Sequence, residues 1–468
     1  MQTSPLQKPA TGPIDAGADK EAQLHASLGQ LLLRQERYAQ AINELTAALD
    51  ARPDNASWLA SRAEAQEHAG AIMKAIDDAA SAVIAEPNNA EYAALLARVL
   101  LRSGRNDEAV MSWAEAIRLD GEQVSYYEGL AHAMWVNGDL NAALEIYDKL
   151  SAGYPGNENY ALLIADIQMQ QGEHAKAAAT CQAALNRGIK SALIYRAYGN
   201  AMLAAGDKAK ASEFYTAGLA IAPKDGYLLH MLSTARGERT ERAPEDYVRA
   251  VFDSRGDTYE ASALFRLGVR VPGLIRREIL RVRPKLDPTR PGAHKLSAVL
   301  DLGCGTGLLG TLVYDLTAYL KGVDLSRNIV RNAQLKGIYH EIEITDIVAS
   351  MNADPRLYEC ILAADVLCYF GNLQPVFEAA FKRLLPSGLF VFSVESGPEA
   401  WRTDLAAGVS KDPYRLLDTA RYAHALSYVE QTAKAAGFEI VQVWPEILST
   451  ENDVDLPGYV VSLRRPLS

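Results

Sequence analysis

The feature that most constrains the fold of this 468-residue chain is a recurrence of small residues every 34 positions. Alanine recurs at this interval, glycine precedes most of these alanines by five positions, and proline follows most of them by twelve. Glycine permits a tight turn between two helices, alanine lets them approach closely, and proline ends the second helix. The interval therefore predicts a solenoid of helix pairs, in which each unit buries its apolar face against the next. The recurring residues are Ala41, Ala75, Ala109, Ala143, Ala177 and Ala211; Gly70, Gly104, Gly138, Gly172 and Gly206; and Pro53, Pro87, Pro155 and Pro223.

This unit resembles the tetratricopeptide repeat, which has the same length and also folds as two antiparallel helices. Leu28-Gly29 of the first unit matches a pair of residues that is typical of the family. The resemblance implies an α solenoid of six repeats over residues 21–223, after a disordered tail over residues 1–20.

The resemblance also implies a concave surface. In this family, residues at certain positions of the first helix of each repeat line that surface. We expect the residues at these positions to form a groove for a protein or peptide partner, or else no more than a solvated face. A single surface histidine such as His132 is often incidental. The groove candidates are Arg98, His132, Trp135 and Asp166.

Composition excludes several classes of function. Most of the net charge of −11 falls in residues 1–223, whereas binding to phosphate backbones needs clustered lysine and arginine, so we expect no nucleic-acid partner. We find no apolar run long enough for a membrane span and no apolar core of a secretory signal near Met1. The four cysteines lack metal-ligand spacing, so we expect no metal site, no disulfides and a cytoplasmic location.

A glycine-rich loop marks the second half of the chain. The apolar segment 297–302 predicts a strand, residues 308–313 open a helix, and Gly303, Gly305 and Gly307 alternate between them. Such glycines allow a sharp turn and remove side chains where a ligand contacts main-chain amides. The dinucleotide-binding fingerprint would place a small residue at position 308, where this chain has leucine.

This spacing, with Asp301 two residues before the first glycine, resembles motif I of the class I S-adenosylmethionine-dependent methyltransferases. Asp324 ends the next apolar strand, about 20 residues after the loop, where a carboxylate can accept both ribose hydroxyls. Asp346 resembles the acid that faces adenine in this family, helped by the amide of Ile347. Each acid has the alternative role of a helix cap or a loop residue. The resemblance implies S-adenosylmethionine as cofactor, contacted by Asp301, Gly303, Gly305, Gly307, Asp324, Leu325, Asp346, Ile347 and Ala364.

Helices and strands alternate through residues 296–468, which predicts a doubly wound sheet with its site at the carboxyl ends of the strands. The resemblance implies a Rossmann-like sheet of seven strands with an antiparallel closing strand, formed by residues 437–444 and 458–465. The whole arrangement resembles a bacterial group of predicted methyltransferases that carry tetratricopeptide repeats. The chain departs from the pattern of this group in two places. Glu359 stands where motif IV often begins with aspartate, and Ser254-Arg255 interrupts a region that we expect to be more aromatic.

Residues 224–295 form a connector with a different character. We expect a helix over 226–235 that caps the solenoid, and two further helices that begin at Pro244 and Pro272, because proline fits the first turn of a helix. These helices either cover the cofactor or only pack the two domains together. The aromatic residues that would cover the cofactor or pack between the domains are Tyr247, Phe252 and Tyr259.

Methyl transfer needs an in-line approach of the acceptor, and it needs a base only where the acceptor must lose a proton. The catalytic candidates are Asp365, Tyr369 and His424, and the substrate-binding candidates are Arg421 and Tyr422. His424 is either a general base or a structural histidine. Arg421 either orients an anionic acceptor or pairs with Asp418. Residues 363–366 lack the motif that is typical of adenine or glutamine amino-group methylation, so we disfavour that reaction.

Three functions remain open. The first is a methyltransferase whose repeats recruit a protein substrate or place the enzyme in an assembly. The second is a methyltransferase that acts on a small molecule or glycan precursor, with repeats that form a homodimer. The third is an interaction protein that binds the cofactor without turnover, which the intact glycines and acids disfavour.

Overall fold

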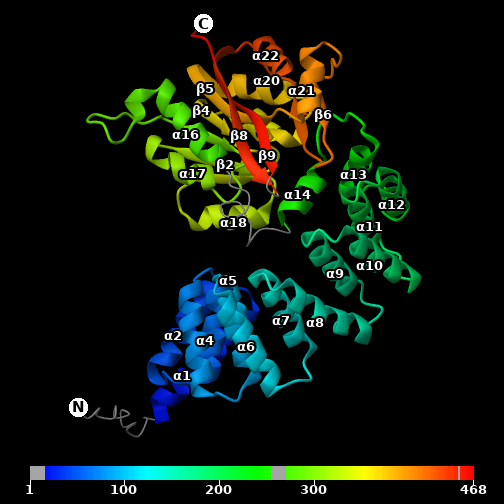
Figure 1. The fold of residues 1–468 in the computed structure, drawn as a ribbon. Coiled ribbons are helices and arrows are strands. Elements are labelled where there is room, and N and C mark those ends of the chain that lie inside the picture. The colour runs from blue at the N-terminus through cyan, green and yellow to red at the C-terminus, as the bar shows by residue number, and fades with distance from the viewer. Residues whose placement is uncertain (1–15, 254–269, 452–453, 468) are drawn as a thin grey trace, which may run out of the picture. The chain divides into compact units, whose positions relative to one another are not determined.

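The computed structural model describes residues 16–253, 270–451 and 454–467 (Figure 1). The chain forms two compact units, Met1–Glu173 and His174–Ser468. The boundary between the units falls inside the range 21–223 that we predict for the solenoid.

The first unit is an array of helices in antiparallel pairs, as the 34-residue interval predicts (Figure 1). Its recurring alanines, such as Ala75 and Ala109, are fully buried. Gly138 ends α7 in the left-handed conformation with φ of 95°, which other residues rarely adopt. A Cβ atom on Gly129 of α7 would lie 2.5 Å from the ring of Trp113 on α6, so glycine is needed where α6 and α7 pack together. The helices are α1 (Ala16–Arg34), α2 (Tyr38–Ala51), α3 (Ala56–His68), α4 (Ile72–Ala85), α5 (Ala90–Arg102), α6 (Asn106–Leu119), α7 (Val124–Asn137), α8 (Leu140–Gly153) and α9 (Glu158–Gln170).

The second unit begins with further helices of the same kind, followed by the connector. The expected capping helix is α13, and the helices expected at Pro244 and Pro272 are α14 and α16. Helices α11 to α13 share a hydrophobic core with the sheet that follows, which explains why they belong to this unit. The helices are α10 (His174–Asn186), α11 (Ala192–Ala204), α12 (Lys208–Ile221), α13 (Gly226–Arg236), α14 (Glu245–Asp253), α16 (Val271–Val282) and the short η1 (Pro284–Leu286).

A mixed nine-stranded sheet forms the centre of the second unit (Figure 1). Seven strands follow the order β3-β2-β1-β4-β5-β9-β8, in which β9 runs antiparallel to both β5 and β8. This is the predicted seven-stranded sheet with its antiparallel closing strand. The hairpin β6–β7, which we did not predict, adds two short strands at the carboxyl end of β5. The strands are β1 (Val299–Leu302), β2 (Leu320–Asp324), β3 (Glu341–Ile344), β4 (Tyr358–Ala363), β5 (Leu384–Glu395), β6 (Tyr414–Leu416), β7 (Tyr422–His424), β8 (Glu439–Glu451) and β9 (Val454–Arg464).

Alternate residues of the central strands enter two separate cores, because successive side chains of a strand point to opposite faces. Leu300 and Phe390 belong to the core shared with α20, α22 and the repeat helices, whereas Val299 and Leu389 belong to the core under α16 and α17. The sheet is therefore covered on both faces, as a doubly wound fold requires. The remaining helices are α17 (Leu308–Val313), η2 (Tyr314–Leu316), α18 (Arg327–Leu335), α19 (Ile347–Ala353), η3 (Leu367–Tyr369), α20 (Gln374–Arg383), α21 (Glu399–Ala406) and α22 (Leu426–Ala435).

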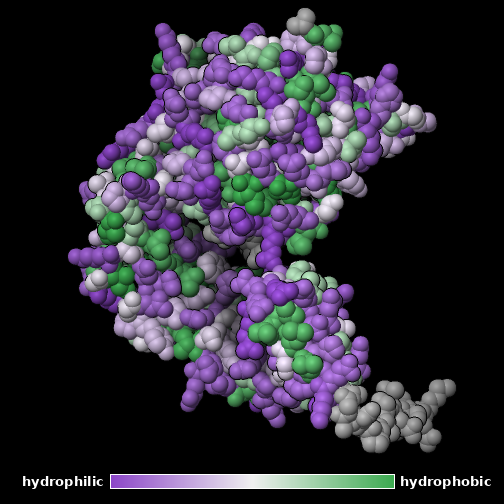
Figure 2. Space-filling view, turned by 180° about the vertical axis from the view of Figure 1, so that it is seen from behind, coloured by the Kyte–Doolittle hydropathy of each residue, from purple (hydrophilic) through white to green (hydrophobic). Residues whose placement is uncertain are grey.

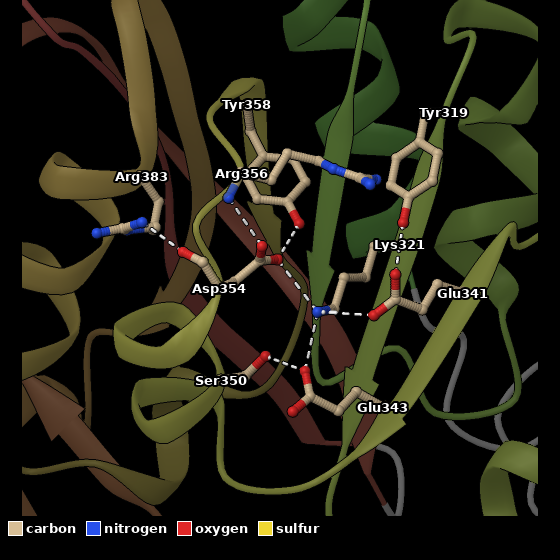
Figure 3. A network of polar contacts seen from close by, with 9 residues as sticks. All are labelled: Tyr319, Lys321, Glu341, Glu343, Ser350, Asp354, Arg356, Tyr358 and Arg383. Carbon is tan, nitrogen blue, oxygen red and sulfur yellow. Dashed lines mark hydrogen bonds and ion pairs between the residues drawn. The ribbon is translucent and has the colours of Figure 1, made fainter.

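The buried side chain of Lys321 forms ion pairs that join β2, β3 and the segment leading into β4 (Figure 3). The Lys321 ammonium is 6% exposed and lies 3.0, 2.9 and 3.1 Å from carboxylate oxygens of Glu341, Glu343 and Asp354. Tyr358 donates a hydrogen bond to Asp354 from the adjoining strand. Burial alone would lower the pKa of Lys321, but the three carboxylates outweigh it and raise that pKa. Because Lys321 lies near the start of β2, this network is at the amino ends of the strands and stabilises the sheet away from the glycine-rich loop.

Hydrophilic residues cover most of the face shown in Figure 2, and the apolar residues on it form smaller patches. Among the described residues, no helix is both long enough and apolar enough to span a membrane.

Candidate active site

The glycine-rich loop connects β1 to α17 and has the geometry that its sequence predicts. Gly303, Gly305 and Gly307 all have positive φ angles, of 68°, 52° and 84°. A Cβ atom on Gly303 would lie 2.7 Å from Val366, so this glycine lets the loop approach the segment after β4. A Cβ atom on Gly305 would meet no heavy atom of the described residues within 4 Å. Space for a ligand therefore opens at the middle glycine.

Asp324 ends β2 and contacts this loop directly. Its Oδ2 atom accepts a hydrogen bond from the Gly305 amide at 2.9 Å, and Oδ1 accepts one from the Ser326 amide at 2.9 Å. Burial raises the pKa of Asp324 overall, although these amides act in the opposite direction. Leu325, the next residue, is half-buried. The predicted ribose-binding carboxylate thus lies beside the predicted cofactor loop.

Asp301 lies on β1 and is 1% exposed. Its Oδ2 atom accepts a hydrogen bond from the Tyr339 hydroxyl at 2.7 Å. Burial raises the pKa of Asp301 to about 7, and the Tyr339 hydrogen bond opposes this rise. Nothing in the sequence pattern indicated Tyr339, because it precedes β3 and no motif contains it.

Asp346 follows β3 and caps α19, which is the alternative role that we considered for it. Its Oδ1 atom accepts hydrogen bonds from the amides of Val348 and Ala349 at 3.1 and 3.0 Å. The Oδ2 atom accepts one from Arg242 of the connector at 2.7 Å. Ile347 is the first residue of α19 and is buried. Arg242 was not identified from the sequence, because an aspartate that caps a helix gives no indication of a distant arginine partner.

Asp365 follows β4 and has a strained backbone, with φ of 53°. Its amide donates a hydrogen bond to Ser393 Oγ of β5 at 3.0 Å, which fixes this conformation. Asp365 and Ala364 are partly exposed, whereas Tyr369 is 9% exposed. The Phe252 ring of α14 meets Tyr369 edge to face at 5.7 Å. The predicted residues at this strand end are thus together, next to the glycine-rich loop.

The connector aromatics have two different environments. Tyr247 packs against Tyr227 and His230 of α13, so it joins the connector to the repeat helices. Phe252 instead packs near Cys304 of the glycine-rich loop. The third candidate, Tyr259, lies outside the described residues.

The acceptor-side candidates lie on or beside the hairpin β6–β7 and are more enclosed than we expected. Arg421 Nε lies 2.5 Å from Glu395 Oε1 at the end of β5. The pairing that we considered between Arg421 and Asp418 is wrong, because Asp418 pairs with Lys208 of α12 at 2.6 Å. The buried carboxylate of Glu395 at the end of β5 attracts Arg421 into the protein. The short spacing between Arg421 and Asp418 along the chain could not indicate this distant partner.

Tyr422 and His424 are both fully enclosed. The Tyr422 hydroxyl lies 2.5 Å from Thr240 Oγ1, and Tyr422 is 0% exposed. His424 is 1% exposed, and its Nε2 atom contacts the Phe370 carbonyl at 2.8 Å. Burial lowers the pKa of His424 to about 4, although the Phe370 contact acts in the opposite direction. This environment favours the structural role for His424 and leaves Asp365 as the more accessible candidate base.

The groove candidates of the first unit lie on α5, α7 and α9, and several of them are engaged in contacts between helices. Arg98 pairs with Glu67 of α3 at 2.9 Å. The Trp135 indole donates a hydrogen bond to Gln170 at 2.7 Å and meets the His132 ring edge to face. Burial lowers the pKa of His132. Asp166 is also engaged in a polar or electrostatic contact.

The loop fits a bound nucleoside-type cofactor. Thr306 Oγ1 is buried without a hydrogen-bond partner among the described residues, and it lies next to the open space at Gly305. Buried polar groups normally have a partner, so this hydroxyl suits contact with a ligand. The Asp324 carboxylate adds hydrogen-bond acceptors for a diol at the same place.

The second unit has the Rossmann-like sheet and glycine-rich loop that are typical of methyltransferase domains, and helix pairs of the tetratricopeptide type precede it in the chain. Residues 269–443 match the family described as a methyltransferase domain. Residues 27–91, 72–124, 94–158 and 134–192 match tetratricopeptide repeat families.

Curated proteins similar to this chain include ubiquinone biosynthesis O-methyltransferases. The mitochondrial protein of Rattus norvegicus is 26% identical over 27% of this chain and 38% of its own length. The Idiomarina loihiensis protein is 24% identical over 36% of this chain and 75% of its own length. The Burkholderia vietnamiensis protein is 30% identical over 23% of this chain and 51% of its own length. The chain thus spans between about two fifths and three quarters of these relatives.

A solved structure of magnesium protoporphyrin IX methyltransferase from Synechocystis PCC 6803, with bound SAH, aligns with a TM-score of 0.36 at 17% identity. The alignment covers 47% of this chain and 100% of that one.

Proposed function

We propose that this protein transfers the methyl group of S-adenosylmethionine to a hydroxyl group of a small molecule. The observation that carries the proposal is the contact between Asp324 and the Gly305 amide, beside open space in the glycine-rich loop. Asp301 lies on β1, Asp324 ends β2 and Asp365 follows β4, and these three strands are adjacent in the sheet. The cofactor, when bound, supplies an electrophilic methyl group on its sulfonium.

Asp365 is the base that we propose for the acceptor hydroxyl. Its carboxylate would accept the proton that the acceptor hydroxyl loses as its oxygen takes the methyl group. Ser393 accepts a hydrogen bond from the Asp365 amide, and its hydroxyl donates to Asp365 Oδ1 at 3.5 Å, so Ser393 helps to orient the carboxylate. Orientation of this kind accounts for much of the rate of a displacement reaction.

Three observations support a small, uncharged acceptor. The similar curated proteins are named as O-methyltransferases of ubiquinone biosynthesis. Arg421 is paired with Glu395, so its charge is compensated and it is a poor partner for an anionic acceptor. Tyr422 and His424 are buried, so this side of the site presents enclosed walls rather than an open groove for a protein segment.

Radioactive methyl transfer tests the proposal. The purified chain is incubated with methyl-tritiated S-adenosylmethionine and a lysate that lacks the protein, and the label is measured in small-molecule, glycan and protein fractions. We expect label in the small-molecule fraction. We expect Asp365→Asn to abolish labelling while it leaves binding of S-adenosylhomocysteine intact, and Asp418→Asn, at an exposed position, to label normally. Label only in protein would overturn the small-molecule acceptor, and binding without labelling of any fraction would support the non-catalytic alternative.

We propose, as a second function, that the first unit binds a protein or peptide segment. The aromatic pair of His132 and Trp135 on α7 and the charged pair of Glu67 and Arg98 on α3 and α5 support this proposal, because all of these helices are the first of their pairs. Trp135→Ala should weaken capture of a partner and leave methylation of a small acceptor unchanged. Met111→Ala is the matched control. Met111 is 72% exposed and lies on α6, the second helix of its pair, so the substitution should leave capture unchanged.

A further inference from the structure

Tyr339 lies two residues before β3 and has no role in the reaction proposed above. Its hydroxyl donates to Asp301 Oδ2 at 2.7 Å across a separation of 38 residues. The ring packs against both the core under α16 and α17 and the small cluster around Cys304 behind the glycine-rich loop. Tyr339 therefore joins the middle of β1 to the back of the proposed cofactor site.

Glycines on separate elements make room for this ring. A Cβ atom on Gly310 of α17 would lie 2.2 Å from the Tyr339 hydroxyl oxygen. A Cβ atom on Gly322 of β2 would lie 3.0 Å from the ring, and one on Gly307 would lie 3.1 Å from it. The contact at Gly310 is too close for any Cβ atom, and those at Gly322 and Gly307 are tighter than most Cβ contacts, so the tyrosine has little freedom to move. A side chain confined in this way can hold its hydrogen-bond partner in one orientation.

The charges around Asp301 explain why orientation matters. The acidic groups that face it are Asp324 from β2, the Tyr339 hydroxyl and the Cys304 thiol from the loop. No ion pair joins Asp301 to a basic side chain within the described residues. A buried carboxylate without a cationic partner is costly, and a hydrogen-bond donor reduces this cost only in part. A ligand that brings an ammonium group would compensate the charge.

We propose that Tyr339 is a positioning residue that holds the Asp301 carboxylate aimed at the primary ammonium group of the cofactor's amino-acid end. This inference rests on the proposed function, because it requires S-adenosylmethionine at the loop. The Tyr339–Asp301 pair then distinguishes ligands that carry an amino-acid end from adenosine thioethers that lack it.

Two thioethers that share the adenosine part separate this role from a merely structural one. S-adenosylhomocysteine carries the ammonium group, and 5′-methylthioadenosine does not. Tyr339→Phe keeps the ring and removes only the hydroxyl. Hydrogen bonds to charged groups are strong enough that we expect this variant to bind S-adenosylhomocysteine about tenfold more weakly or worse by calorimetry. Binding of 5′-methylthioadenosine should stay within about twofold of the wild-type value.

The chain contains a matched control for this substitution. Tyr358 also donates its hydroxyl to a buried aspartate, Asp354, but at the amino ends of the strands. Tyr358→Phe removes the same chemical group and should leave the affinity ratio of the two ligands unchanged. An equal loss of both ligands in Tyr339→Phe, or no loss of either, would overturn the inference.

Asp301→Asn tests the same idea through the other partner. It should lower the affinity ratio by at least as much as Tyr339→Phe, and adding Tyr339→Phe to it should lower the ratio no further. If Tyr339→Phe does not fold, an unchanged ratio in Asp301→Asn overturns the inference by itself. Failure of the wild-type protein to bind either ligand would instead overturn the proposed function.

Discussion

The Oδ2 atom of Asp324 accepts a hydrogen bond from the amide of Gly305, so the end of β2 is joined to the loop that follows β1. The two residues are 19 positions apart in the chain and come from adjacent parallel strands. This contact brings a carboxylate, which can accept hydrogen bonds from ribose hydroxyls, next to the open space at Gly305. It is the geometric basis of the proposed cofactor site.

Gly305→Ala should weaken cofactor binding more than it weakens the fold. The new methyl group would enter the open space at the loop, and the residue would keep a φ of 52° that costs about 1 kcal/mol for an alanine. Gly104→Ala is the matched control, because Gly104 also has a positive φ and open space but lies in the first unit. Chemical denaturation should show similar destabilisation in both variants, whereas calorimetry should show lost S-adenosylhomocysteine binding only for Gly305→Ala. Equal affinities in the two variants would exclude the loop as the binding site.

Cofactor affinity should decrease as the pH falls through the titration of Asp301. Burial raises the pKa of Asp301 to about 7, so below this pH the carboxyl is neutral and no longer attracts an ammonium group. Because one pH unit below a pKa costs about tenfold in the ionised fraction, S-adenosylhomocysteine should bind about tenfold more weakly at pH 6 than at pH 8. Calorimetry over this range measures the effect. Asp301→Asn should bind weakly and with a flat profile, and a flat wild-type profile would contradict the prediction.

Lys321→Met should destabilise the second unit strongly and leave cofactor binding intact. The substitution leaves Glu341, Glu343 and Asp354 without their shared cation, and breaking a buried ion pair costs about 3–5 kcal/mol. Urea denaturation gives the change in the free energy of unfolding. Lys434→Met, at an exposed position on α22, should change it by less than about 0.5 kcal/mol. Similar losses in the two variants would show that the network of Figure 3 contributes little.

The stability of the second unit should decrease as the pH is lowered from about 6.5 toward about 4, partly because of His424. Burial lowers the pKa of His424 to about 4, so in this window the unfolded chain binds a proton that the folded protein does not. The free energy of unfolding therefore rises with pH across the window. His424→Gln should reduce this slope, as measured by denaturation at several pH values. His294→Gln, at an exposed position, should leave the slope unchanged, and an unchanged slope for His424→Gln as well would refute the assignment.

Local patterns predicted those features that depend on residues close together in the chain. The 34-residue interval predicted the helix pairs, because turns and close helix contacts require glycine and alanine at fixed offsets. The alternating glycines predicted positive φ angles in the loop, and the strands ending at Asp324 and Ala363 follow from their apolar runs. The closing antiparallel pair is also where the sequence predicted it.

Contacts between distant elements could not be predicted in this way. Arg242 reaches Asp346 across 104 residues, and Arg421 turned out to pair with Glu395 rather than with its neighbour Asp418. The hairpin β6–β7 was missed because its strands have three residues each, too few for a periodic signal. The roles of Tyr339 and Ser393 also depend on which strands become neighbours.

The repeated helix pairs, the doubly wound domain and its glycine-rich loop can all be predicted from the amino-acid sequence, because periodicity and turn chemistry act over short separations along the chain. The core that α11 to α13 share with the sheet, and the groups that surround Asp301 and Asp365, become known only from the folded protein. Burial and charge pairing depend on which residues pack together in space, and local sequence patterns do not specify those neighbours.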